Sequence, residues 1–268
     1  MIGKKFYYFF NLISIFFAFN SFAACLATKE QMPIQAVIFD CDGILVDTEF
    51  LKFQAWQQAA KNQGFSFTLE EYLPLVGHSG ETIAAAIKQL KEKEYPWRRV
   101  NSLELDEERT RFYHQLQSNP KNIVLIEPMV ALAKQLNENK KLLGYKLGLA
   151  SSAPLDEIKV NLETIGLSNV FDFIISGKDS LDDIRDPEGV NKPKPYIYQR
   201  IAQWMKVDPA QCVVFEDTHA GVRAAVTAGM KVYAVPNQYT KKHNFEEALA
   251  ILDTKQNCQF NKIFEVME

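Results

Sequence analysis

The chain has 268 residues, of which 47% are apolar and 24% are charged, and these are typical values for a globular protein. Its net charge of −3 provides no basic field for a nucleic-acid backbone, so we expect no nucleic-acid partner. The length fits one large domain or a domain with an insert.

The first 24 residues are expected to lie outside the fold. Lys4 and Lys5 precede an almost wholly apolar run over residues 6–19, and small residues follow up to Ala24. This order is typical of a secretory signal. The apolar run is shorter than the ~20 residues of a membrane-spanning helix, which favours cleavage over a retained anchor and leaves no membrane span. We therefore expect export to the periplasm, with lipidation of Cys25 as an alternative.

Residues 36–49 are the most informative segment. The apolar residues 36–39 predict a buried strand, and Asp40, Cys41, Asp42 and Gly43 follow it directly. Two carboxylates this close repel each other, so they are rarely kept for stability alone. Such a pair usually holds a cation, attacks an electrophile or moves a proton.

The next seventy residues predict helices and no convincing strand. Apolar residues recur at helical spacing over three segments, namely 50–62, 82–91 and 106–117. We therefore expect an all-helical insert over residues 50–122.

Strands and helices alternate in the rest of the chain. Strands are predicted at 146–150, 171–175, 212–215 and 231–235. Helices are predicted at 130–137, 155–165, 197–205 and 221–228. Strands separated by helices of this length predict an α/β fold with a doubly wound parallel sheet, formed by residues 32–49 and 123–268.

Polar side chains follow three of the predicted strands: Asp40 and Asp42, Ser151 and Ser152, and Glu216 and Asp217. Ligands of an open parallel sheet bind at the carboxyl ends of its strands, so we expect all three groups in one crevice. Lys192 lies in a loop stiffened by prolines at positions 193 and 195, which can hold its side chain in a set place.

The chemistry follows from these residue types. Acids around one point suit Mg²⁺, while a serine and a lysine suit phosphate. The backbone amides after Asp40 can add a small anion-binding nest. Asp40 could then attack phosphorus, and Asp42 could protonate the leaving oxygen and later deprotonate water. We therefore expect a phosphatase acting on a small phosphorylated metabolite, as a monomer.

These motifs resemble the haloacid dehalogenase-like superfamily of phosphatases, in the helical-cap branch. The resemblance lies in residues 40–43 with 46–49, in Ser151, in Lys192, and in residues 214–225. It implies a Rossmann-like core with a cap, and Asp40 as nucleophile with Asp42 as general acid and base. It also implies Mg²⁺ held by the Asp40 side chain, the Asp42 carbonyl and Asp217, with Glu216 nearby.

Four further residues are candidate substrate contacts: Cys41, Ser152, Lys52 and His78. The mutases of this branch have a histidine where this chain has Lys52, and a phosphate-binding arginine where it has Gly80. This difference favours hydrolysis over a phosphosugar mutase, which remains the alternative. A non-catalytic phosphate-accepting module is a third hypothesis.

Several of these side chains also have purely structural interpretations. Ser151 could cap a turn, Lys192 could be a solvated loop residue, and Glu216 and Asp217 could cap the next helix. His78 and His219 could be an exposed loop residue and a first-turn helix residue. The cysteines have no metal-ligand spacing, and we expect no disulfide network because two of them, at 41 and 212, fall in predicted buried strands.

Overall fold

The computed structural model describes residues 34–254. The expected signal segment and Cys25 therefore lie outside the described residues, as does Cys258. Within the described part of the chain, no helix combines the length and apolar character that crossing a membrane requires.

A six-stranded parallel sheet forms the centre of the fold. Its spatial order is β5-β4-β1-β6-β7-β8, and every neighbouring pair is parallel. The strands are β1 (Ala36–Phe39), β4 (Lys146–Ser151), β5 (Phe173–Ser176), β6 (Cys212–Glu216), β7 (Lys231–Ala234) and β8 (Ala250–Ile251). The prediction of a doubly wound α/β sheet is confirmed, and the first strand lies between β4 and β6.

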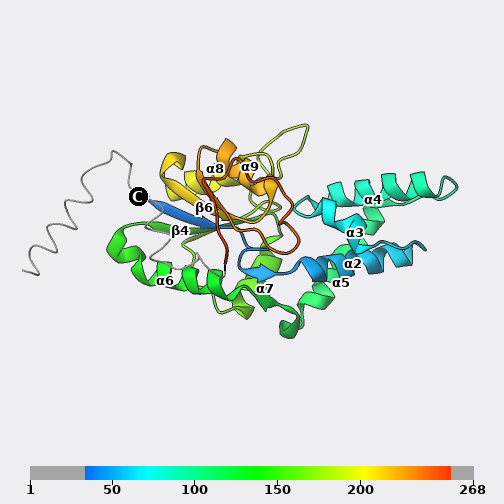
Figure 1. Ribbon diagram of the computed structural model, residues 1–268, viewed down its shortest axis with the longest axis horizontal. Helices are drawn as coiled ribbons and strands as arrows, with labels where there is room; N and C mark the ends of the chain where they lie inside the picture. The colour runs from blue at the N-terminus through cyan, green and yellow to red at the C-terminus, as the bar shows by residue number, and fades with distance from the viewer. Residues whose placement is uncertain (1–33, 255–268) are drawn as a thin grey trace, which may run out of the picture. The chain divides into compact units, whose positions relative to one another are not determined.

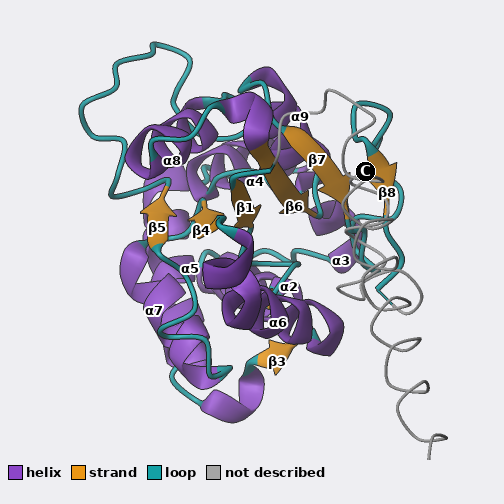
Figure 2. Ribbon diagram, turned by 90° about the vertical axis from the view of Figure 1, so that its left-hand side faces the viewer, coloured by secondary structure: helices purple, strands orange, loops and turns teal. Residues whose placement is uncertain are grey.

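Helices cover both faces of this sheet (Figure 2). One face carries α6 (Glu127–Leu143) and α7 (Leu155–Thr164), and the other carries α8 (Tyr196–Met205) and α9 (His219–Thr227). Successive strand side chains point to opposite faces, so Val37 and Phe39 join the α6/α7 core while Ala36 and Ile38 join the α8/α9 core. A strand buried on both faces explains why residues 36–39 are apolar without alternation.

Residues 49–122, called the helical insert below, contain helices and no strand. The insert consists of α2 (Glu49–Asn62), α3 (Leu69–Tyr72), α4 (Gly80–Glu94) and α5 (Ser102–Gln117), with 3₁₀ turns η1 (Leu73–Leu75) and η2 (Pro120–Asn122). It has its own core, which includes Trp56, Phe67 and Leu105. Its helices group beyond one end of the sheet (Figure 1).

A two-stranded antiparallel ribbon connects the insert to the sheet. Its strands are β2 (Val46–Asp47), which enters the insert, and β3 (Val124–Leu125), which leaves it. The Ile126 amide extends the ribbon by donating to the Leu45 carbonyl at 2.9 Å. The two crossings of the chain therefore lie side by side.

Several elements differ from the predictions in length, for local reasons. The α4 helix begins at Gly80 because the Ser79 hydroxyl accepts the Thr82 amide, and α5 begins at Ser102 because Asn101 accepts the Glu104 amide. The two-residue strands β2, β3 and β8, the short α3 helix and the short 3₁₀ turn η3 (Pro209–Gln211) were not predicted. Such short elements have too few residues to show a period.

Candidate active site

The first predicted carboxylate lies where β1 ends. Asp40 follows Phe39, and its amide donates to the Phe215 carbonyl of β6 at 3.0 Å. The chain then turns tightly at Gly43, whose φ of +80° is a left-handed conformation that favours glycine. A Cβ at Gly43 would also lie 2.1 Å from Asp217 Oδ2. The turn therefore lets the backbone approach a second acidic side chain closely.

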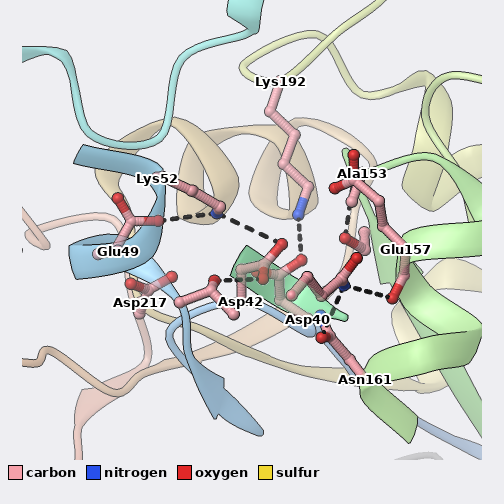
Figure 3. Close-up of polar contacts among 12 residues, drawn as sticks. Asp40, Asp42, Glu49, Lys52, Ala153, Glu157, Asn161, Lys192 and Asp217 are labelled. Atoms are coloured by element: carbon pink, nitrogen blue, oxygen red, sulfur yellow. Dashed lines mark hydrogen bonds and ion pairs between the residues drawn. The ribbon is translucent and has the colours of Figure 1, made fainter. Parts of the chain in front are cut away.

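Asp42 points toward the start of the helical insert. Its carboxylate accepts a hydrogen bond from the Thr48 hydroxyl at 2.5 Å and lies 3.4 Å from Lys52 Nζ (Figure 3). Thr48 precedes α2 at the N-cap position, yet its side chain makes no capping bond and is used to hold Asp42. Lys52 also donates to Glu49 at 2.8 Å, and Glu49 in turn accepts the Tyr72 hydroxyl at 2.8 Å. Thr48 and the first turn of the insert thus hold the Asp42 carboxylate.

Lys192 joins the strand ends of β1 and β6. Its Nζ atom is 2.9 Å from Asp40 Oδ1 and 2.5 Å from Glu216 Oε1, and its side chain is 5% exposed. Burial alone would lower the pKa of this ammonium, but Asp40 and Glu216 hold it well above its ordinary value. Lys192 is therefore a charged, positioned side chain and not a solvated loop residue.

Glu216 has little free hydrogen-bonding capacity. Besides Lys192, its Oε1 accepts the Tyr198 hydroxyl at 2.8 Å. Its Oε2 accepts the amides of Asp217 and Thr218 and the Thr218 hydroxyl, at 3.0 to 3.2 Å. Glu216 consequently orients Lys192 and the loop after β6.

Three carboxylates, those of Asp40, Glu216 and Asp217, have oxygens within 4.8 Å of one another. Asp217 Oδ2 accepts the Asn237 amide at 2.8 Å, whereas its buried Oδ1 has no hydrogen-bond partner among the described residues. The carboxylate of Asp42 is not part of this cluster, so a metal contact of Asp42 would use its backbone carbonyl.

The donor set of this cluster fits a divalent cation. Burial raises the pKa of Asp40 from 3.8 to about 7, because Lys192 offsets the lost hydration only in part and Glu216 adds repulsion. Burial, with repulsion from Glu216 and Asp40, holds the pKa of Asp217 well above its ordinary value. Oxygen ligands left short of positive charge and a buried oxygen without a partner are what Mg²⁺ would satisfy. Asp40 and Asp217 are the side chains available to hold it.

Four further predicted residues line the same cavity as the two aspartates. Ser151, Ser152, Lys52 and His78 line the same cavity of about 250 Å³ as Asp40 and Asp42. The Ser151 hydroxyl accepts the Ala153 amide at 3.2 Å.

Cys41 and His219 lie elsewhere. The Cys41 side chain is fully buried in the core, in the turn after β1 and not in the strand. Burial holds the pKa of its thiol well above its ordinary value. A ligand would therefore meet Cys41 through its backbone amide and not through sulfur. His219 lies outside this cavity, with Nδ1 2.7 Å from the Asn244 carbonyl.

Several residues of the helical insert that line the cavity were not predicted from the sequence, among them Trp56, Asp106 and Arg109. Arg109 Nη2 is 2.6 Å from Asp106 Oδ1. No motif marks these positions, and a pair of opposite charges three residues apart is common on solvated helices.

Comparison with known proteins gives consistent matches. The family model described as haloacid dehalogenase-like hydrolase matches residues 37–235. The phosphorylated carbohydrates phosphatase of Thermotoga maritima is 29% identical over 238 residues, which are 87% of this chain and 100% of that protein. The putative phosphatase YhcW of Bacillus subtilis is 31% identical over 80% of this chain and 89% of its own. The crystal structure of β-phosphoglucomutase from Clostridium difficile is similar, with a TM-score of 0.69 and 26% identity, over 87% of this chain and 96% of that one.

Proposed function

The chain belongs to the haloacid dehalogenase-like hydrolase family, and we propose that it is a Mg²⁺-dependent phosphatase of small organic phosphate monoesters. The observation that carries the proposal is the position of Asp40. Its carboxylate lies at the end of the central strand, lines the cavity, and is held by the buried Lys192 ammonium at 2.9 Å.

Asp40 and Asp42 divide the chemistry between them. An Asp40 oxygen attacks phosphorus and forms an aspartyl-phosphate, while the bond from phosphorus to the leaving oxygen breaks and Asp42 gives that oxygen a proton. Asp42 then takes a proton from water, whose oxygen attacks phosphorus, and phosphate leaves as the Asp40 carboxylate re-forms. Thr48 and Lys52 stabilise the Asp42 carboxylate that the first step leaves behind.

The other side chains bind and orient the phosphate. Lys192 can donate to a phosphoryl oxygen while Glu216 keeps its ammonium in place. The Ser151 hydroxyl and the amides after Asp40 are further donors at the same strand ends. When bound by Asp40 and Asp217, Mg²⁺ would supply positive charge that lets an anionic nucleophile approach an anionic phosphate.

The structure corrects one part of the argument against a mutase. Gly80 carries no charge, but the arginine side chain of Arg109 occupies the space next to it, so this region is not without a cation. That cation is paired with Asp106, whose carboxylate would repel a phosphate bound beside it. A mutase must bind a second phosphate at its cap, and Arg109 would have to share its guanidinium between that phosphate and Asp106. We therefore favour hydrolysis.

Phosphate release tests the proposal. In the presence of Mg²⁺, the full chain should release phosphate from a panel of small phosphate monoesters. Excess EDTA should stop this release. Asp40→Asn should retain the fold and lose turnover, whereas the control Asp183→Asn, at a side chain that is 72% exposed, should behave as the unaltered chain. Acid quenching during turnover should trap a phosphorylated enzyme with the unaltered chain and none with Asp40→Asn. Near-normal turnover by Asp40→Asn would exclude this mechanism.

The same assays separate the two alternatives. A mutase would interconvert glucose 1-phosphate and glucose 6-phosphate much faster than it releases phosphate. A module that only accepts phosphate would become phosphorylated once, and it would not release phosphate repeatedly.

We also propose that the protein is exported. The proposal rests on Lys4, Lys5, the apolar run over residues 6–19 and the small residues before Cys25, all of which lie outside the described residues. Fractionation of native cells tests it, because export predicts a shortened chain outside the cytoplasm.

A further inference from the structure

A second cavity, of about 630 Å³, lies where the helical insert meets residues 34–48 and 123–254, called the sheet domain below. The insert lines it with residues of the segment 74–78, and the sheet domain lines it with loop residues and with residues of α9. His78 also lines the cavity that contains Asp40, so the two cavities are neighbours. The volume is in the range of small-molecule pockets, about 300–1,000 Å³.

The lining of this second cavity is basic. Among the described lining residues, five have basic side chains and none has an acidic one. The basic residues are His78, Lys194, His219, Arg223 and His243. The whole chain has a net charge of −3, so this surface departs from the average of the molecule. A cavity of this composition favours an anionic ligand over a cationic one.

Arg223 provides a permanent positive charge. It belongs to α9, is exposed, and forms no ion pair with any described residue. Lys194 differs, because its ammonium is paired with Asp186 and Glu188, which do not line the cavity. The guanidinium of Arg223 therefore keeps its N–H donors for a ligand.

His243 adds a neutral hydrogen-bond donor. Its Nδ1 atom accepts the His219 amide at 3.3 Å, so the proton of the neutral ring is on Nε2. Burial holds the pKa of His243 below its ordinary value, and the nearby His219 and His78 lower it further. The ring is therefore neutral at neutral pH, and no described contact uses its Nε2 proton.

The three histidines of the lining do not form a metal centre. Among the described residues, Asp40, Glu216 and Asp217 are the one group of three or more possible ligands whose atoms lie within 4.8 Å of one another. The imidazoles are thus spread over the wall and do not converge on one point. Spread donors match a ligand with several acceptor groups and not a single ion.

The insert and the sheet domain are in direct contact beside this cavity. Gly77 has a φ of +90°, and a Cβ at this position would lie 2.8 Å from Thr218 Cγ2. Thr218 follows Asp217 and is the N-cap residue of α9. A ligand in the cavity would contact both sides of this junction.

We propose that this cavity is a second binding site, separate from Asp40, for a small organic polyanion with phosphate or carboxylate groups. Arg223 and His243 donate hydrogen bonds to the anion from the sheet domain. The opposite side of the anion packs against the segment 74–78, so the bound ligand links the insert to the sheet domain.

Calorimetric titration without divalent metal tests this site with two probes. Tricarballylate carries three carboxylates, and methylenediphosphonate carries two phosphonates that cannot be hydrolysed. We expect at least one probe to bind, and the tighter one identifies the chemistry of the ligand. Absence of binding by both probes would overturn the proposal.

Two variants assign the binding to this cavity. Arg223→Met removes a charged donor and should weaken the tighter probe about 10-fold or more. His243→Asn keeps an acceptor for the His219 amide but removes the Nε2 donor, and it should weaken the same probe about 3-fold or more. The matched control is Arg111→Met, at a side chain that is 74% exposed and outside this cavity, and it should bind as the unaltered chain. If Arg223→Met loses its circular dichroism signal, His243→Asn decides.

The variant Asp40→Asn separates this site from the active site. It should bind the probe with the affinity of the unaltered chain. A probe whose affinity changes in Asp40→Asn and not in Arg223→Met would occupy the active site and overturn the proposal. These titrations need no turnover, so an absence of phosphate release would defeat the proposed function alone.

Hydrogen exchange tests the link between the two parts. Saturating probe should slow amide exchange both in the insert segment 74–79 and in the sheet-domain segment 240–246. Slower exchange in the sheet domain alone would show that the ligand does not link them, and the proposal would fail.

Discussion

Replacing Lys192 with methionine should destabilise the metal-free protein strongly. The change keeps the length of the side chain but removes an ammonium that lies 2.9 Å from Asp40 and 2.5 Å from Glu216. Both carboxylates are buried, so each would be left without its cationic partner. Removing one partner of a buried ion pair costs about 3–5 kcal/mol, and we expect a loss of that size in the free energy of unfolding at pH 8.

Urea unfolding followed by circular dichroism in EDTA measures this loss. Lys192→Met should be less destabilised at pH 5 than at pH 8. Burial raises the pKa of Asp40 to about 7, so at pH 5 this carboxyl is protonated and needs no cationic partner. Adding Glu216→Gln to Lys192→Met should recover part of the loss, since it removes one of the two stranded charges. The control is Lys140→Met, whose ion pair with Asp172 is more exposed and should cost about 1 kcal/mol or less.

The same variant should also lose catalysis. Without the positioned ammonium, turnover should fall about 10²–10³-fold, as for other charge-stabilising donors.

A loss below about 1 kcal/mol in the free energy of unfolding for Lys192→Met would show that the buried cluster is not held together by this charge, and the reasoning would fail.

Four other predictions concern the site and the expected signal segment. Gly43→Ala should cost about 1–3 kcal/mol and weaken Mg²⁺ binding, because its Cβ would strike Asp217; unaltered calorimetric affinity would refute this. In EDTA, the melting temperature should fall as pH rises from about 4 to about 7, since the folded chain keeps a proton on Asp40 that the unfolded chain has already released. If the melting temperature of Asp40→Asn falls equally over this pH range, groups other than Asp40 cause the pH dependence. Ca²⁺ should inhibit phosphate release, because it favours higher and looser coordination, and full activity in Ca²⁺ alone would contradict this. N-terminal sequencing of native protein should begin near Ala24 or Cys25, and an intact Met1 would exclude cleavage.

The strand-end part of the site could be predicted because its geometry follows from the sheet. Asp40, Ser151 and Glu216 are far apart in sequence, yet each lies at the carboxyl end of a strand. Parallel neighbours bring those ends to one edge, whatever the intervening helices do. Lys192 could be predicted for a different reason, because the prolines at positions 193 and 195 indicate a stiff loop.

The insert's part of the site could not be predicted. Glu104, Asp106, Glu107, Glu108, Arg109 and Arg111 all lie on α5, and their spacing alone does not tell which side chains face the cavity. That choice depends on how α5 packs against α2, through contacts between residues that no motif relates. The same holds for Gly80, because its sequence position shows that a side chain is missing but not what fills the space.

The ribbon of β2 and β3 brings together the two ends of the helical insert. Val46 pairs with Leu125 and Asp47 pairs with Val124, so the two points where the chain crosses between insert and sheet are hydrogen-bonded neighbours. A two-residue hairpin turn after Asp47 could therefore replace the whole insert without stretching the sheet. Because the insert enters and leaves at one place, exchanging it need not disturb the strand that ends at Asp40.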